Sequence, residues 1–161
     1  MPEVLSLAAL VAVTIAVATD LRRRRIPNWL TGGALALGLL GGLWLGGPAG
    51  GLSALAGAAL GLLILLPFYA TGGMGAGDVK LLAAVGALVG PQALLSVAFY
   101  GAVVGGLMSL AVLIQHGVVA QAVYHSVASR RWPVLASSIK TPYGVAIAGG
   151  VYLALIAPPV W

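Results

Sequence analysis

Apolar residues fill long runs along this chain, and charges or Gly/Pro breaks separate the runs. An α-helix rises about 1.5 Å per residue, so about twenty residues cross a hydrocarbon layer about 30 Å thick. We therefore predict an all-α, polytopic membrane protein with six transmembrane helices in a single domain over residues 1–161. The predicted helices lie near residues 4–20, 28–46, 51–69, 79–90, 93–115 and 142–160.

The predicted helices differ in length and carry regularly spaced glycines. The fourth predicted helix is short for a complete crossing, and several helices carry glycines four residues apart, which let helix backbones approach closely in lipid.

The basic residues all fall in alternate connections: residues 22–25 are arginines, Lys80 opens the fourth helix, and Arg130, Arg131 and Lys140 precede the sixth. Because cytoplasmic loops are enriched in Lys and Arg, we expect an even number of crossings with both termini outside the cytoplasm.

The amino-acid composition also indicates a protein that is surrounded by lipid. Hydrophobic residues make up 61% of the chain and charged residues only 7%, whereas soluble domains carry about a quarter charged residues. The net charge of +5 is then better explained by cytoplasmic loops than by nucleic-acid binding. The first apolar run is expected to be a retained helix, because Glu3 precedes it and the arginines follow it, the reverse of a secretory signal.

Some kinds of chemistry are excluded or disfavoured by residue content. The chain has no cysteine, which excludes disulfides, thiolate catalysis and cysteine zinc sites. His116 and His125 are nine residues apart and share no obvious helical face, so we expect no metal site. They lie in the polar segment 116–141, which is predicted to form a cytoplasmic connection with a short amphipathic helix.

The acidic residues are Glu3, Asp20 and Asp78. Glu3 is close to the terminus and is expected to be solvated. Asp20 ends the first predicted helix and Asp78 begins the fourth, so the topology places both at the cytoplasmic membrane boundary. Ionisable residues near membrane depth are candidates for function, although Asp20 is also suited to cap its helix or to pair with the following arginines.

Asp78 closes a glycine-rich run, Thr-Gly-Gly-Met-Gly-Ala-Gly-Asp, over residues 71–78. Backbone that is not helical near a membrane must be buried in protein or line water, so we expect this run to carry Asp78 to a hydrated pocket. A Walker A loop requires Gly-Lys-Ser/Thr after its glycines, but Val79 follows Asp78 here. The run also lacks the preceding strand and glycine spacing of a dinucleotide-binding fingerprint.

Two carboxyl groups beside a water molecule are suited to peptide hydrolysis without a metal. When they lie close together they share one proton, so one carboxylate acts as a base on water and the other carboxyl acts as an acid toward the scissile carbonyl. The pair titrates as a unit, so neither aspartate receives a separate role. Lys80 is expected to anchor its helix at the interface, with an influence on the ionisation of the pair as the alternative.

These residues resemble the type IV prepilin peptidases, a family of intramembrane aspartic proteases. The resemblance rests on Asp20 followed by Arg-Ile-Pro-Asn at residues 25–28, and on Gly-Gly-Met-Gly-Ala-Gly-Asp-Val-Lys at residues 72–80, which contains the Gly-x-Gly-Asp signature. Pro-Tyr-Gly at residues 142–144 also looks like the family. The resemblance implies that Asp20 and Asp78 are the catalytic pair and that the enzyme cuts the basic leader from prepilins or pseudopilins in a bacterial-type cytoplasmic (inner) membrane.

The chain looks like the short branch of this family that processes Flp-type pilins of tight-adherence systems. It lacks the cysteine zinc region of the members that also methylate their product, so no cofactor is implied. Gly75 and Gly77 are expected to admit an extended substrate or simply to allow close packing. The expected partners are the pilin precursor and the lipid bilayer, and the sequence leaves the oligomeric state open.

Two other functions remain open at this stage. A small proton- or cation-coupled channel or transporter would use Asp20 and Asp78 as an ion site, although such sites belong near the bilayer midplane and often on repeated halves. A membrane scaffold without chemistry would use the glycine run only as a tight connector, and the match to the signature would then be a coincidence.

Overall fold

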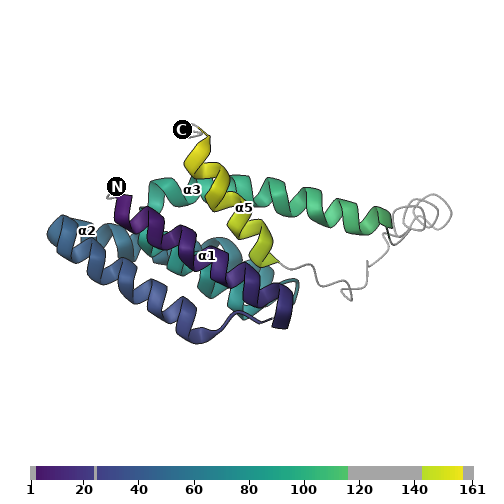
Figure 1. The fold of residues 1–161 in the computed structure, drawn as a ribbon, viewed down its shortest axis with the longest axis horizontal. Coiled ribbons are helices and arrows are strands. Elements are labelled where there is room, and N and C mark those ends of the chain that lie inside the picture. The colour runs from purple at the N-terminus through teal and green to yellow at the C-terminus, as the bar shows by residue number, and fades with distance from the viewer. Residues whose placement is uncertain (1–2, 24, 116–142, 158–161) are drawn as a thin grey trace.

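The computed structural model describes residues 3–23, 25–115 and 143–157, and all statements below refer to these residues. It contains the helices α1 (Glu3–Arg23), α2 (Asn28–Ala70), α3 (Ala76–Gln115) and α5 (Tyr143–Ile156), as Figure 1 shows. The all-α prediction is confirmed for these residues. Segment 116–141, with its two histidines, and the predicted residues 142 and 158–160 of the last helix lie outside them.

Four helices are described where six were predicted, because α2 and α3 each cover two predicted helices. Three of the four, α1, α2 and α3, contain stretches long and apolar enough to cross a membrane, and α5 is a shorter apolar helix.

Both long helices are interrupted at a glycine that precedes a proline. Gly47 and Gly90 have positive φ angles of 60° and 77°, a conformation open to glycine, and Pro48 and Pro91 follow them. Proline supplies no N–H to the helical ladder, so regular helix cannot continue through it. The two interruptions fall at the boundaries that the sequence predicted between its second and third helices and between its fourth and fifth.

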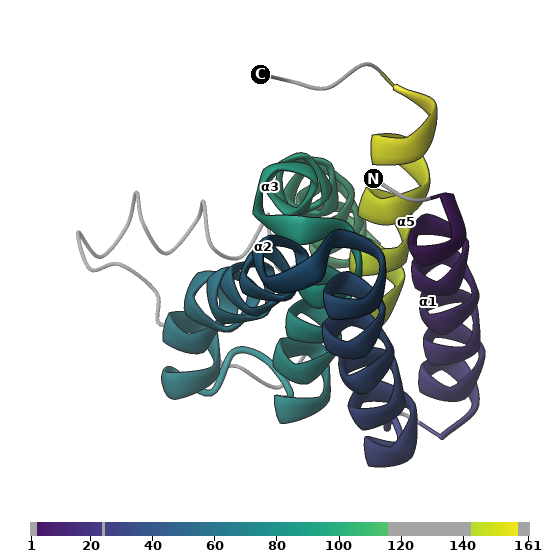
Figure 2. The ribbon, with the colours of Figure 1, turned by 90° about the vertical axis from the view of Figure 1, so that its left-hand side faces the viewer.

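The chain turns back at these interruptions. A Cβ atom built on Gly42 would lie 3.1 Å from the Cβ of Ala54, although twelve residues of straight helix would separate them by about 18 Å. In α3, a Cβ built on Gly86 would lie 2.9 Å from Cδ2 of Leu94. Figure 2 shows the two parts of α2 as separate neighbouring rods. Each long helix is therefore a helical hairpin in shape.

The core is built around the first part of α3. Every residue from 81 to 90 is buried, and α3 contacts α1, α2 and α5. The outer surface, in contrast, carries many large apolar side chains, such as Trp44, Trp29 and Leu40, which are 89%, 69% and 66% exposed. A water-soluble bundle would cover such a continuous apolar exterior, so this surface is suited to lipid. The packing therefore places the chain in a membrane.

Candidate functional site

Asp20 lies near the carboxyl end of α1 and faces the beginning of α5. Its side chain is only 9% exposed, and its carboxyl group interacts with the backbone N–H of Gly144. The Oδ2 atom is buried and forms no hydrogen bond of good geometry within the described part of the chain. A buried carboxyl oxygen without a partner is costly, so this atom has unused hydrogen-bonding capacity for water or a substrate.

Asp78 lies in the first turn of α3 and is partly buried. Its carboxyl group interacts with the backbone N–H of Gly75, while its own N–H donates to the carbonyl oxygen of Gly75 over 3.2 Å. Since α3 begins at Ala76, this arrangement resembles the half of a capping box in which an acidic side chain reaches back to the N-cap N–H. Asp78 therefore has a structural role at the helix end, and this contact also fixes where its carboxyl group lies.

The fold brings the two aspartates into one electrostatic neighbourhood. The charge of Asp20 acts on the carboxyl group of Asp78, although the two residues are far apart in the sequence. Asp20 lies on α1 and Asp78 lies on α3, and these two helices pack against each other. Two carboxyl groups in such proximity are electrostatically coupled, so the protonation of one affects that of the other.

The glycine-rich connection between α2 and α3 is a compact turn. Gly72 has a positive φ of 75°, and the N–H of Gly73 donates to the carbonyl oxygen of Phe68 over 3.0 Å. A Cβ atom built on Gly77 would lie 3.2 Å from the Cβ of Ile26, in the connection between α1 and α2, and one on Gly75 would lie 3.3 Å from Oδ2 of Asp78. Gly77 thus allows close packing, while Gly75 leaves space beside the Asp78 carboxyl group.

Lys80 joins the beginnings of two helices. Its Nζ atom donates to Oδ1 of Asn28 over 3.1 Å, and its side chain is exposed. Asn28 is the first residue of α2, and Pro27 is the N-cap before it. This contact links the beginning of α3 to the beginning of α2.

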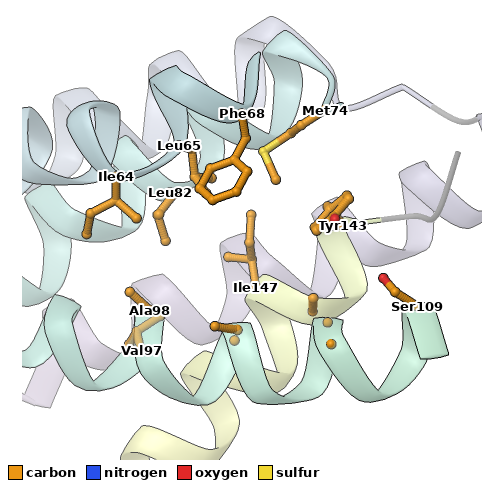
Figure 3. Close-up of a pocket in the computed structure, with 15 residues that line it drawn as sticks. Ile64, Leu65, Phe68, Met74, Leu82, Val97, Ala98, Ser109, Tyr143 and Ile147 are labelled. Carbon is orange, nitrogen blue, oxygen red and sulfur yellow. The ribbon is translucent and has the colours of Figure 1, made fainter. Parts of the chain in front are cut away.

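An apolar groove of about 420 Å³ lies between α2, the second part of α3, and α5. Figure 3 shows Phe68 and Met74 on one side of it and Tyr143 and Ile147 on the other. Neither aspartate lines the groove, but two of its lining residues are sequence neighbours of glycines close to the aspartates, because Met74 precedes Gly75 and Tyr143 precedes Gly144. Most of the lining residues that come from the second part of α3 are small, among them Ala98, Gly101, Ala102, Gly105 and Gly106.

Sequence reasoning missed the contact between Gly144 and Asp20. The Tyr-Gly pair at residues 143–144 contributed to the family resemblance without receiving a role. The available signal was a side-chain-free residue close to the start of an apolar helix, but nothing local to it indicates which helix end it meets. Among the described residues, no three His, Asp or Glu side chains are grouped as metal ligands.

Comparison with known proteins identifies one family. The sequence model of the type IV leader peptidase family matches residues 7–110, a range that contains both Asp20 and Asp78. No curated protein and no solved structure matches the chain.

Proposed function

The chain belongs to the type IV leader peptidase family, and we propose that it is an aspartic endopeptidase that removes the leader from type IV prepilins or pseudopilins. The observation that supports the proposal is that the packing of α1 against α3 brings Asp20 close enough to Asp78 for the charge of one carboxyl group to act on the other. These two residues supply the pair of carboxyl groups that metal-free peptide hydrolysis requires.

In the proposed reaction, the pair holds one proton and one negative charge. The ionised carboxylate takes a proton from water as the water oxygen attacks the scissile carbonyl carbon, and the protonated carboxyl group donates its proton toward the carbonyl oxygen. As the tetrahedral intermediate collapses, the C–N bond breaks, and the carboxyl group that took the proton from water gives it to the departing nitrogen. A hydroxyl group of the intermediate returns its proton to the other carboxylate, so the pair again holds one proton and one negative charge. The products are the leader with a new carboxyl terminus and the pilin with a new amino terminus.

The proposal includes a topology. If each part of α2 and α3 on either side of Gly47 and Gly90 crosses the bilayer, the chain has six crossings together with α1 and α5. Arg22, Arg25 and Lys80 then lie at the same boundary as the aspartates, and the preference of Lys and Arg for the cytoplasmic side favours the cytoplasm for this boundary. The active site would accordingly face the cytoplasm from a bacterial-type inner membrane.

We further propose that the substrate is an Flp-type prepilin whose apolar segment enters the groove beside the aspartates. Support comes from the apolar lining of the groove and from its position, since Met74 and Tyr143 each precede a glycine that contacts one of the aspartates. Small residues on the wall from α3 permit a close approach by another chain in lipid. A basic leader would then extend from the groove past the two carboxyl groups.

The test is co-expression of the enzyme with Flp-type prepilins, followed by mass spectrometry of the amino terminus of the pilin. Asp20→Asn and Asp78→Asn are expected to abolish leader removal while the protein remains in the membrane. Glu3→Gln is the matched control, because Glu3 is exposed on α1 and its replacement removes a carboxylate away from the site. Mature pilin produced by either aspartate variant would count against the proposed pair.

A further inference from the structure

We propose that Gly144 is a positioning residue that fixes the Asp20 carboxyl group for hydrolysis. The catalytic part of this inference rests on the proposed function, whereas the contact itself can be tested without any activity. Gly144 lies in the first turn of α5 and is buried. It is placed to act on the reaction through Asp20.

Space around Gly144 is taken up by the aspartate. A Cβ atom built on Gly144 would lie 3.0 Å from Oδ2 of Asp20 and 3.5 Å from both its Cγ and its Cβ. A contact of 3.0 Å is tighter than nearly all real Cβ contacts, so the carboxyl group would have to move by a few tenths of an ångström. Glycine at this position therefore lets the carboxyl group lie directly against the α5 backbone.

The backbone N–H of Gly144 also lies close to the Asp20 carboxyl group. The first N–H groups of a helix have no acceptor within that helix, and the N–H of Gly144 interacts with the Asp20 carboxyl group. A separate observation points to the same place: Asp20 is about nine-tenths buried, and its Oδ2 has no well-formed hydrogen bond to any residue that the structure describes. The start of α5 thus restrains the carboxyl group while one of its oxygens retains capacity for another partner.

The rest of α5 holds Gly144 in this position. The hydroxyl groups of Thr14 in α1 and Tyr152 in α5 are hydrogen-bonded over 2.7 Å. On another side of α5, Gly150 packs so tightly that an added Cβ would lie 2.8 Å from the backbone nitrogen of Gly101 in α3. Because α5 contacts both helices that carry the aspartates, its register determines how Gly144 meets Asp20.

The first experiment compares Gly144→Ala with Gly149→Ala in the purified full-length enzyme. Gly149 is a matched control, because an added Cβ would be similarly crowded, at 3.1 Å from Cγ1 of Val104, but away from the aspartates. A misplacement of about 1 Å costs about 10²-fold in rate, so a shift of a few tenths of an ångström predicts a fall in kcat of about tenfold for Gly144→Ala. KM should change less than about twofold, since uniform substrate binding is unaffected.

The second experiment measures thermal unfolding in detergent and requires no activity. Gly144→Ala is expected to lower Tm in the wild-type background but not in an Asp20→Ala background, because the crowded carboxyl group is then gone and the remaining Cβ contact is an ordinary one. If Gly144→Ala alone fails to fold, the Asp20→Ala change should restore its accumulation in the membrane. Such coupling between neighbours is what a double-mutant cycle detects.

Three results would overturn the inference. They are a kcat for Gly144→Ala within about twofold of wild type, an equal loss of kcat in Gly149→Ala, and the absence of coupling to Asp20→Ala in the unfolding measurement. The proposed function fails separately, if Asp20→Asn still releases mature pilin. If the effects of Gly144→Ala and Asp20→Ala on Tm are coupled but Asp20→Asn still removes the leader, the contact between Gly144 and Asp20 is confirmed and its role in catalysis is rejected.

Discussion

Gly57 of α2 and Gly86 of α3 pack backbone against backbone. A Cβ atom built on Gly57 would lie 2.7 Å from the carbonyl carbon of Gly86, and one built on Gly86 would lie 2.6 Å from the carbonyl carbon of Gly57. Both contacts are shorter than real Cβ atoms show, and backbone atoms cannot rotate away as a side chain can. This pair therefore sets the distance between α2 and the part of α3 that carries Asp78.

The first prediction follows from this packing. Gly57→Ala should destabilise the protein by about 1–3 kcal/mol, the usual cost of overpacking a well-packed core. Gly33→Ala is the matched control in the same helix, since an added Cβ there meets nothing within 4 Å, and alanine is intrinsically better than glycine in a helix. Thermal unfolding in detergent measures both. Equal stability of the two variants would show that the helices can separate without cost.

The sequence predicted the helical class, and the interruptions at Gly47 and Gly90 fall where glycine and proline break the apolar runs. It also indicated that Asp20 and Asp78 share a site, because the topology placed both helix ends at one boundary. The Gly144 contact could not be found in this way. Apolar runs report how long a helix is, but the register of α5 against α1 depends on packing between residues far apart in the sequence.

The second prediction concerns the bond that joins α1 to α5. Tyr152→Phe removes the hydroxyl that is hydrogen-bonded to Thr14, and interhelical hydrogen bonds in membrane proteins contribute about 0.6 kcal/mol on average. We expect a loss of stability of that size, with a smaller loss when Thr14→Val is already present. A double-mutant cycle by unfolding in detergent measures this coupling. Strictly additive losses would mean that the bond does not contribute to holding α5 on α1.

The third prediction distinguishes a structural role of Lys80, through its hydrogen bond to Asn28, from an electrostatic influence on the aspartates. If Lys80 anchors α3 to α2 through Asn28, Lys80→Met and Asn28→Ala should each lower stability modestly, by about 0.5–1.5 kcal/mol, and the double variant should lose little more than either one. The pH dependence of cleavage should stay the same in both variants. A shift of that profile in Lys80→Met but not in Asn28→Ala would favour an electrostatic influence on the aspartates instead.

The fourth prediction tests the groove as the binding place for the apolar part of the substrate. A Cβ built on Gly106 meets nothing within 4 Å, so Gly106→Phe is expected to fold and to occupy the groove. KM should rise severalfold with little change in kcat, because a loss of uniform binding raises KM alone. Gly33→Phe adds the same side chain at another open position and should leave KM unchanged. An unaltered KM in Gly106→Phe would contradict binding of the apolar part of the substrate in the groove.

The fifth prediction concerns pH. A pair of carboxyl groups that must hold one proton between them is active only when one is ionised and the other is protonated, so kcat/KM should fall on both sides of its optimum. The acidic and basic sides of this pH profile report ionisations of the pair as a unit, not of Asp20 or Asp78 separately. The measurement is kcat/KM against pH in detergent, within the range where the fold is intact by thermal unfolding. Glu3→Gln should preserve both sides of the profile, because Glu3 is an exposed carboxylate that takes no part in the pair. If kcat/KM falls only on the acidic side, activity requires an ionised carboxylate but no protonated one. The mechanism in which the two aspartates share one proton would then be wrong, even if both aspartates proved essential.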